Sequence, residues 1–143
     1  MAAEVWQRIF SFLISTRRHR DVVLERLGLT PNDAKALNTL QGEGRSMRSL
    51  ADEWLCDASN ATWMVDRLEE RGLAERHTVP SDRRLKLVQL TSEGARVKQQ
   101  MLEGMTEPPP ELLELDPPEL EALLGLLAKL PGSDADPFSA GKG

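Results

Sequence analysis

The hydrophobic period of this chain changes after Gly72, and this change restricts its possible folds more than any other feature. Before Gly72, apolar residues recur at helical spacing and predict a helix over residues 59–71. Its inward stripe consists of Ala61, Met64, Val65 and Leu68. After Gly72, two extended segments are expected, one ending at Val79 and one covering residues 85–91. The residues between them, Pro80 to Arg84, predict a polar hairpin tip.

A shorter helix is expected before this one. Ser46 can cap its start, and a tight connection over residues 56–58 follows it. The positions expected to face inward are Leu50, Ala51 and Leu55. A short helix, a tight turn, a second helix and a two-stranded hairpin form, in this order, the layout of a winged helix-turn-helix. The predicted fold is therefore mainly α with a small β-hairpin wing, and the winged helix-turn-helix covers about residues 30–91.

Thr30 marks the start of the first helix of this unit. A hydroxyl cap is followed there by proline at the first helical position and by the carboxylate of Asp33 in the first turn. Gly42 and Gly44 are expected to end this helix. Its inward residues are Ala34, Leu37 and Leu40.

Two further helices are expected after the hairpin. Thr91 caps the first, which runs to Met105 and is broken by the prolines at residues 108–110. Asp116 begins the last helix, which Pro131 ends. The apolar residues of this last helix are Leu120, Leu123, Leu124, Leu127 and Leu130.

The helix expected over residues 4–27 is apolar on more than one face of its first half. The residues responsible are Val5, Trp6, Ile9, Phe10, Phe12, Leu13 and Ile14. A helix of a single domain usually buries one apolar stripe, so this helix is either a central core helix or, as we favour, part of a subunit interface. We expect a homodimer joined by residues 5–14 together with the C-terminal helices around Met101 and residues 123–130.

Length and composition bound the possible functions. A chain of 143 residues has the size of one domain, which we expect over residues 1–131 with dimerisation helices at about 4–27 and 92–131. The tail over residues 132–143 is polar and glycine-rich and is expected to be disordered. No stretch approaches the ~18 apolar residues of a membrane span, so the protein is expected in the cytoplasm with no membrane partner.

The sequence lacks a constellation that could carry catalysis or hold a metal ion. No Cys or His cluster has metal-ligand spacing, and neither a phosphate-binding loop nor a nucleophile elbow occurs. We therefore expect no cofactor and no enzymatic activity. Cys56 is expected to be a half-buried packing residue rather than an oxidant sensor, because no neighbour that would stabilise a thiolate is evident. Glu69 and Glu70 are expected to be solvated.

Taken alone, the net charge of −5 argues against a nucleic-acid partner, but the charge is distributed unevenly along the chain. Residues 45–98 hold ten basic and nine acidic side chains, whereas residues 99–143 hold two and nine. The acidity thus belongs to the C-terminal third. Arg83, Arg84 and Lys86 gather at the hairpin, where a local positive field can form.

Candidate DNA contacts lie on the outward side of the helix at residues 59–71. They are Ser59, Asn60, Thr62, Trp63 and Arg67. Asn, Ser and Thr side chains can hydrogen-bond base edges or phosphates in a major groove, and an indole can contact a thymine methyl group. A solvated polar face is the alternative, but an exposed tryptophan favours a partner.

The hairpin tip supplies a second group of candidates, Asp82, Arg83 and Arg84. Arginine is favoured in narrow, A·T-rich minor grooves, and a carboxylate two residues away can orient its guanidinium group. Alone, this pattern is more typical of a surface salt bridge. Its place between two strands after a helix-turn-helix favours a DNA contact.

These segments resemble the MarR family of regulators. Residues 82–91, DRRLKLVQLT, are similar to the family signature Asp-x-Arg-x-x-x-Val-x-Leu-Thr, and the likeness extends in order over residues 4–131. The resemblance implies an obligate dimer joined by the first, fifth and sixth helices, and a recognition helix at residues 59–71. It also implies that Arg84, held by Asp82, enters the minor groove of a palindromic double-stranded DNA operator. A small aromatic or anionic effector would bind between the dimerisation helices and the DNA-binding lobe.

The leading hypothesis is accordingly a ligand-responsive repressor that binds double-stranded DNA in a sequence-specific manner. The alternative is a winged-helix protein-interaction module without DNA binding, which the acidic net charge keeps open. The two differ in one observable property: only the first predicts association with duplex DNA that weakens steeply with salt.

Overall fold

The structure is a computed structural model that describes residues 1–40 and 43–132. The helices of these residues are α1 (Ala2–Ser15), α2 (Arg17–Arg26), α3 (Pro31–Thr39), α4 (Met47–Trp54), α5 (Ala58–Glu70), α6 (Ser92–Thr106), α7 (Pro110–Leu113) and α8 (Pro117–Leu127). The strands are β1 (Arg45–Ser46), β2 (Ala74–Val79) and β3 (Asp82–Leu90). The predicted fold, mainly α with a small β-hairpin wing, is confirmed. The predictions for Gly42 and for residues 133–143 lie outside the described residues.

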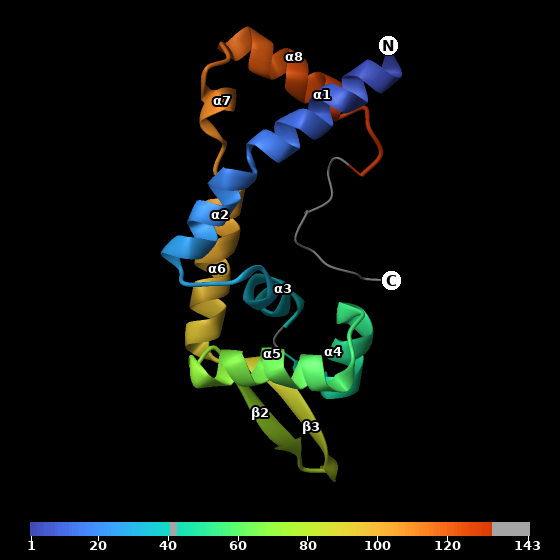
Figure 1. Cartoon of the computed structure of the whole chain (residues 1–143), viewed down its shortest axis with the longest axis vertical. Helices are drawn as coiled ribbons and strands as arrows, with labels where there is room; N and C mark the ends of the chain where they lie inside the picture. The colour runs from blue at the N-terminus through green and yellow to red at the C-terminus, as the bar shows by residue number, and fades with distance from the viewer. Residues whose placement is uncertain (41–42, 133–143) are drawn as a thin grey trace.

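The molecule is elongated, with the β2–β3 hairpin at one end and α1 and α8 at the other (Figure 1). Helices α3, α4 and α5 pack together beside the sheet, and we call residues 30–91 the helix-turn-helix lobe. Helices α2 and α6 run side by side and connect this lobe to the far end (Figure 1). Every helix among the described residues is too short or too polar to span a bilayer.

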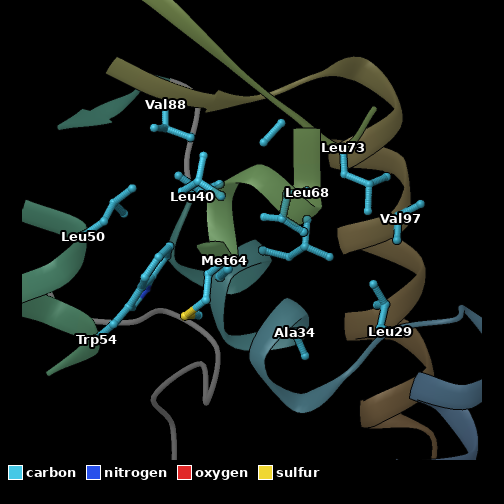
Figure 2. Packing of buried hydrophobic residues seen from close by; sticks show 14 of the residues in the cluster. Leu29, Ala34, Leu40, Leu50, Trp54, Met64, Leu68, Leu73, Val88 and Val97 are labelled. Atoms are coloured by element: carbon cyan, nitrogen blue, oxygen red, sulfur yellow. The ribbon is translucent and has the colours of Figure 1, made fainter. Parts of the chain in front are cut away.

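The core lies where α3, α4 and α5 meet the sheet (Figure 2). All four predicted inward residues of α5 are buried there, together with Leu37, Leu40 and Leu50 at 0% exposure. Burial of one such side chain contributes about 1.5–3 kcal/mol. Figure 2 shows Val88 of β3 pointing at Leu40, so the sheet closes one side of this core. The outward face of α5 is thereby left free.

The inward face of α4 differs from the prediction at its C-terminal end. Leu55 was expected inside but is 93% exposed, and Trp54 is buried in its place at 3% exposure. The helix ends at Trp54, and Leu55 adopts a left-handed conformation with φ 53°, which turns its side chain away from the core. The indole Nε1 of Trp54 donates a hydrogen bond to Thr39 Oγ1 at 3.1 Å, so its polar atom is satisfied inside.

The single helix predicted over residues 4–27 is divided at Thr16 into α1 and α2. The buried Thr16 hydroxyl donates to the carbonyl oxygens of Phe12 and Leu13 at 3.0 and 3.3 Å. Such a bond from a threonine to the preceding turn bends helices. At the other end of the chain, α7 was not predicted, and α8 ends at Leu127 before the predicted Pro131.

The sheet has three antiparallel strands in the order β1-β3-β2. Strand β1 was not predicted, because its two residues are too few to show a period. In the hairpin, Val79 pairs with Asp82 next to a bulge, so the turn consists of Pro80 and Ser81 alone. The predicted tip, Pro80 to Arg84, was therefore too long, and Asp82 to Arg84 belong to β3.

Helix α6 begins against the backbone of Leu73, and this contact tests the packing. A Cβ atom added at Gly94 would lie 1.8 Å from the Leu73 carbonyl oxygen. Gly94→Ala should therefore lower the free energy of unfolding by about 3 kcal/mol or more, because backbone has to move. Gly104→Ala is the comparison variant and should cost less, because its Cβ would meet the side chain of Val23, at 2.7 Å from Cγ1 and 3.2 Å from Cγ2, rather than backbone. Urea unfolding at one protein concentration measures both, and equal losses would contradict the expected order.

Candidate nucleic-acid interface

Helix α5 presents four of the predicted DNA contacts on one exposed face. Its cap is Asp57, whose side chain accepts a hydrogen bond from the Asn60 backbone N–H at 2.7 Å, so the helix starts one residue before the predicted position. Ser59, Asn60 and Thr62 are exposed. Trp63 is 49% exposed although it is a large apolar residue. The N-terminal half of α5 thus offers hydroxyl, amide and indole groups to a partner.

Arg67, the fifth candidate on this helix, is engaged within the protein. Its Nε and Nη2 atoms donate to the two carboxylate oxygens of Asp33 at 3.2 and 3.1 Å. Its guanidinium carbon lies 5.2 Å from the centre of the Trp63 ring, within the range of a cation–π contact. The structure therefore places Arg67 between a buried carboxylate and an exposed indole, an arrangement that the sequence did not indicate.

Asp33 is charged although only 2% of it is exposed. Burial by itself would raise the pKa of Asp33, but hydrogen bonds from Arg67 and from the Thr30 backbone outweigh this effect and hold the pKa below its ordinary value. The same hydrogen bond raises the pKa of Arg67. Arg71 Nη1 lies 3.8 Å from Asp33 and also donates to the Gly28 carbonyl oxygen at 2.8 Å. This cluster joins α3, α5 and the end of α2.

The hairpin holds its three candidates on the exposed surface of β3. Asp82 accepts a hydrogen bond from the backbone N–H of Arg84 at 3.0 Å, so it fixes the strand backbone and not, as predicted, the guanidinium group. Among the described residues, no ion pair or side-chain hydrogen bond engages the guanidinium groups of Arg83 and Arg84. Both cations are available to a partner.

A second ion cluster, missed by the sequence analysis, connects α5 to the hairpin. Arg76 Nη2 lies 2.8 Å from Asp66, and Arg76 Nη1 pairs with Glu69. The Arg76 backbone N–H also donates to Glu69 at 2.9 Å. The prediction that Glu69 is simply solvated was wrong, because β2 folds back along α5 and brings Arg76 to it. Cys56 is half-buried against the core, as predicted.

Comparisons with known proteins agree with this geometry. The MarR family model matches residues 27–85. The HTH-type transcriptional regulator MhqR of Bacillus subtilis is 28% identical over 90 residues, which cover 58% of this chain and 62% of MhqR. The chain thus matches less than two thirds of that relative. Over residues 27–85 the chain is therefore similar to the MarR family.

Solved structures of this family share the fold. MarR of E. coli in its apo form has a TM-score of 0.61 at 26% identity and covers 86% of this chain and 93% of its own. A MepR mutant of S. aureus bound to an oligodeoxyribonucleotide reaches a TM-score of 0.73 at 21% identity, over 90% of this chain and 94% of MepR.

The Asp33 pair makes a prediction about stability and pH. Because the pKa of Asp33 is lower in the folded than in the unfolded chain, its stabilisation is fully present above about pH 4 and is lost as the pH falls through the folded-state pKa. Asp33→Asn should cost about 1–3 kcal/mol at neutral pH, and this difference from wild type should shrink towards about pH 3. Urea unfolding across the pH range measures it, and a difference independent of pH would contradict the charged pair.

Proposed function

We propose that the chain is a transcriptional regulator that binds double-stranded DNA in a sequence-specific manner as a homodimer. The observation that carries the proposal is the pairing of two free surfaces on one lobe: the exposed face of α5 and the unpaired arginines of the hairpin. In this proposal α5 is the recognition helix in a major groove, and the hairpin is the wing in the adjacent minor groove.

The N-terminal half of α5 supports base readout. Asn60 can make bidentate hydrogen bonds to adenine, and the hydroxyl groups of Ser59 and Thr62 can bond either bases or phosphates. The Trp63 indole can contact a thymine methyl group. Arg67 donates from Nε and Nη2 to Asp33, so only its third guanidinium nitrogen, Nη1, can reach a phosphate without loss of this pair.

The hairpin supports shape readout. Arg84 is exposed, and its backbone is fixed by Asp82, so its side chain extends from an ordered strand. A guanidinium group in this place suits the negative potential of a narrow minor groove, while Arg83 can neutralise a phosphate.

A homodimer is supported by the apolar surface at the far end of the molecule. No residue of α1 or α8 is buried within the described chain. The large apolar residues exposed on these two helices are Val5, Trp6, Phe10, Leu13, Ile14, Leu120, Leu124, Leu126 and Leu127. Met101, which we expected at the interface, is 1% exposed inside its own subunit and is not part of this surface. A two-fold dimer requires a palindromic operator with half-sites about 10 base pairs apart.

We also propose that the chain is a repressor whose DNA binding is controlled by a small ligand. A cavity lies between α2 and α6, lined by Val23, Arg26, Leu27, Gln100, Glu103, Gly104 and Glu107. It has a volume of about 200 Å³ and lies between the two helices that connect the helix-turn-helix lobe to the far end. An anionic aromatic effector would pair there with Arg26, because the other charged residues are carboxylates.

The cytoplasmic location stays a prediction.

Arg84→Ala and Asn60→Ala should weaken DNA binding in different ways. Arg84→Ala removes a cation near phosphates, so it should weaken operator and unrelated duplex by comparable factors and flatten the salt slope by about 1. Asp82→Ala should reproduce this effect in part, because it frees the backbone of Arg84. Asn60→Ala should cost about 1–3 kcal/mol chiefly on the operator. Fluorescence anisotropy with both duplexes across a salt series measures these effects.

The operator for this titration comes from selection among random duplexes. Lys129→Ala, which removes a cation beyond the end of α8, is the matched control and should bind both duplexes like wild type. If Arg84→Ala also binds both like wild type, the hairpin is not a wing. If wild type binds no duplex even at low salt, the interaction-module alternative replaces the proposal.

The dimer is tested by one charge placed on α8. Leu124 is 69% exposed, and Leu124→Glu should convert the dimer to a monomer, because a carboxylate would be buried in an apolar interface. Light scattering at micromolar concentration measures the mass. Leu55→Glu places the same charge on the 93% exposed residue of the helix-turn-helix lobe and should stay dimeric. A wild-type protein with the mass of a monomer would contradict the proposed homodimer.

A further inference from the structure

The exposed indole of Trp63 lies against a charged group of its own helix. Trp63 is 49% exposed, and the guanidinium carbon of Arg67, one turn later, is 5.2 Å from its ring centre. A cation over an indole face is attracted by the ring electrons. The contact with Arg67 therefore restrains the Trp63 side chain, which as an exposed residue could otherwise change rotamer.

The guanidinium group is itself held from a different helix. Arg67 donates two parallel hydrogen bonds to Asp33, at 3.2 and 3.1 Å, and this forked geometry defines the plane of the group as well as its position. Asp33 is anchored in turn, because it also accepts a hydrogen bond from the Thr30 backbone N–H at 2.9 Å and is only 2% exposed. A continuous series of contacts runs from a buried carboxylate of α3 to the exposed indole of α5.

We propose that Arg67 is a positioning residue that holds the Trp63 ring, through Asp33, in the orientation in which α5 meets DNA. This inference rests on the proposed function. The alternative is a direct phosphate contact by Arg67 through Nη1, the guanidinium nitrogen that the fork to Asp33 leaves free. A ring that is oriented before binding avoids the entropy cost of fixing it on the DNA. Loss of the restraint should therefore weaken operator binding about three- to tenfold.

Arg67→Lys is the variant that tests this proposal. It keeps the positive charge but cannot form the fork, so the indole should lose its restraint while the salt slope of DNA binding stays unchanged. Arg71→Lys is the matched control: it makes the same change at the residue just after the end of α5, a second partner of Asp33 whose guanidinium group bonds the carbonyl oxygens of Gly28 and Leu27. Asp33→Asn tests the same restraint in a second way, because it weakens the anchor of Arg67 while Arg67 itself is unchanged. Circular dichroism confirms that each variant is folded.

Two measurements decide the outcome. The first is nuclear relaxation of the Trp63 indole N–H in the free protein, assigned with Trp63→Phe. Mobility should increase in Arg67→Lys and not in Arg71→Lys. The second is a double-mutant cycle on the selected operator duplex. If Arg67 acts through Trp63, Arg67→Lys should weaken binding in the wild-type background and have no further effect in Trp63→Ala.

Two results would overturn the proposal. One is an indole that stays as rigid as wild type in both Arg67→Lys and Asp33→Asn. The other is an Arg67→Lys effect of equal size with and without Trp63, which would assign a direct DNA contact to Arg67. A wild-type protein that binds no duplex would overturn the proposed function instead, and the relaxation measurement alone would then decide whether Arg67 holds the ring.

Discussion

The buried carboxylate of Asp33 is the interaction on which the helix-turn-helix lobe depends. A charge that is 2% exposed is costly unless it is fully hydrogen-bonded, and its partners come from α5 and from the backbone at the start of α3. Separation of α3 from α5 would leave this charge unpaired. Arg71 extends the same cluster to the carbonyl oxygens of Leu27 and Gly28, where α2 ends. One buried charge thus ties the outer face of α5 to the segment that leads towards the far end of the molecule.

The opposite edge of α5 is held by the hairpin. Arg76 binds both Asp66 and Glu69, and the inward stripe of α5 packs on the core between the two ion clusters. Helix and hairpin are therefore joined both by ion pairs and by the core. Contacts of this kind would suit the proposed docking into two adjacent grooves, in which each element can contact DNA only if the other is in register.

The sequence predicted the features that depend on local signals. The caps at Thr30, Ser46, Thr91 and Asp116 all lie where expected, because a cap needs only its own first turn. The features it missed depend on contacts between distant residues. Nothing in the neighbourhood of Arg67 shows that Asp33, 34 positions earlier, will take its guanidinium group. The sequence also did not show that Trp54 rather than Leu55 is buried in the core. Helical spacing allows either residue to face inward, and it is the left-handed backbone at Leu55 that turns this side chain outward.

The ion clusters also explain how an acidic chain can offer a positive surface. Asp66 and Glu69 of α5 share one cation, Arg76, which balances one of their two negative charges, whereas Arg83 and Arg84 have no acidic partner among the described residues. The surplus of negative charge comes from residues 99–143, and those of them that the structure describes lie on the distal part of α6, on α7 and on α8, away from the hairpin (Figure 1). Charges are screened beyond about 8 Å at physiological salt, so acidic groups at the far end contribute little to the potential at the wing. The net charge of −5 therefore describes the whole chain but not the surface that would meet a phosphate backbone.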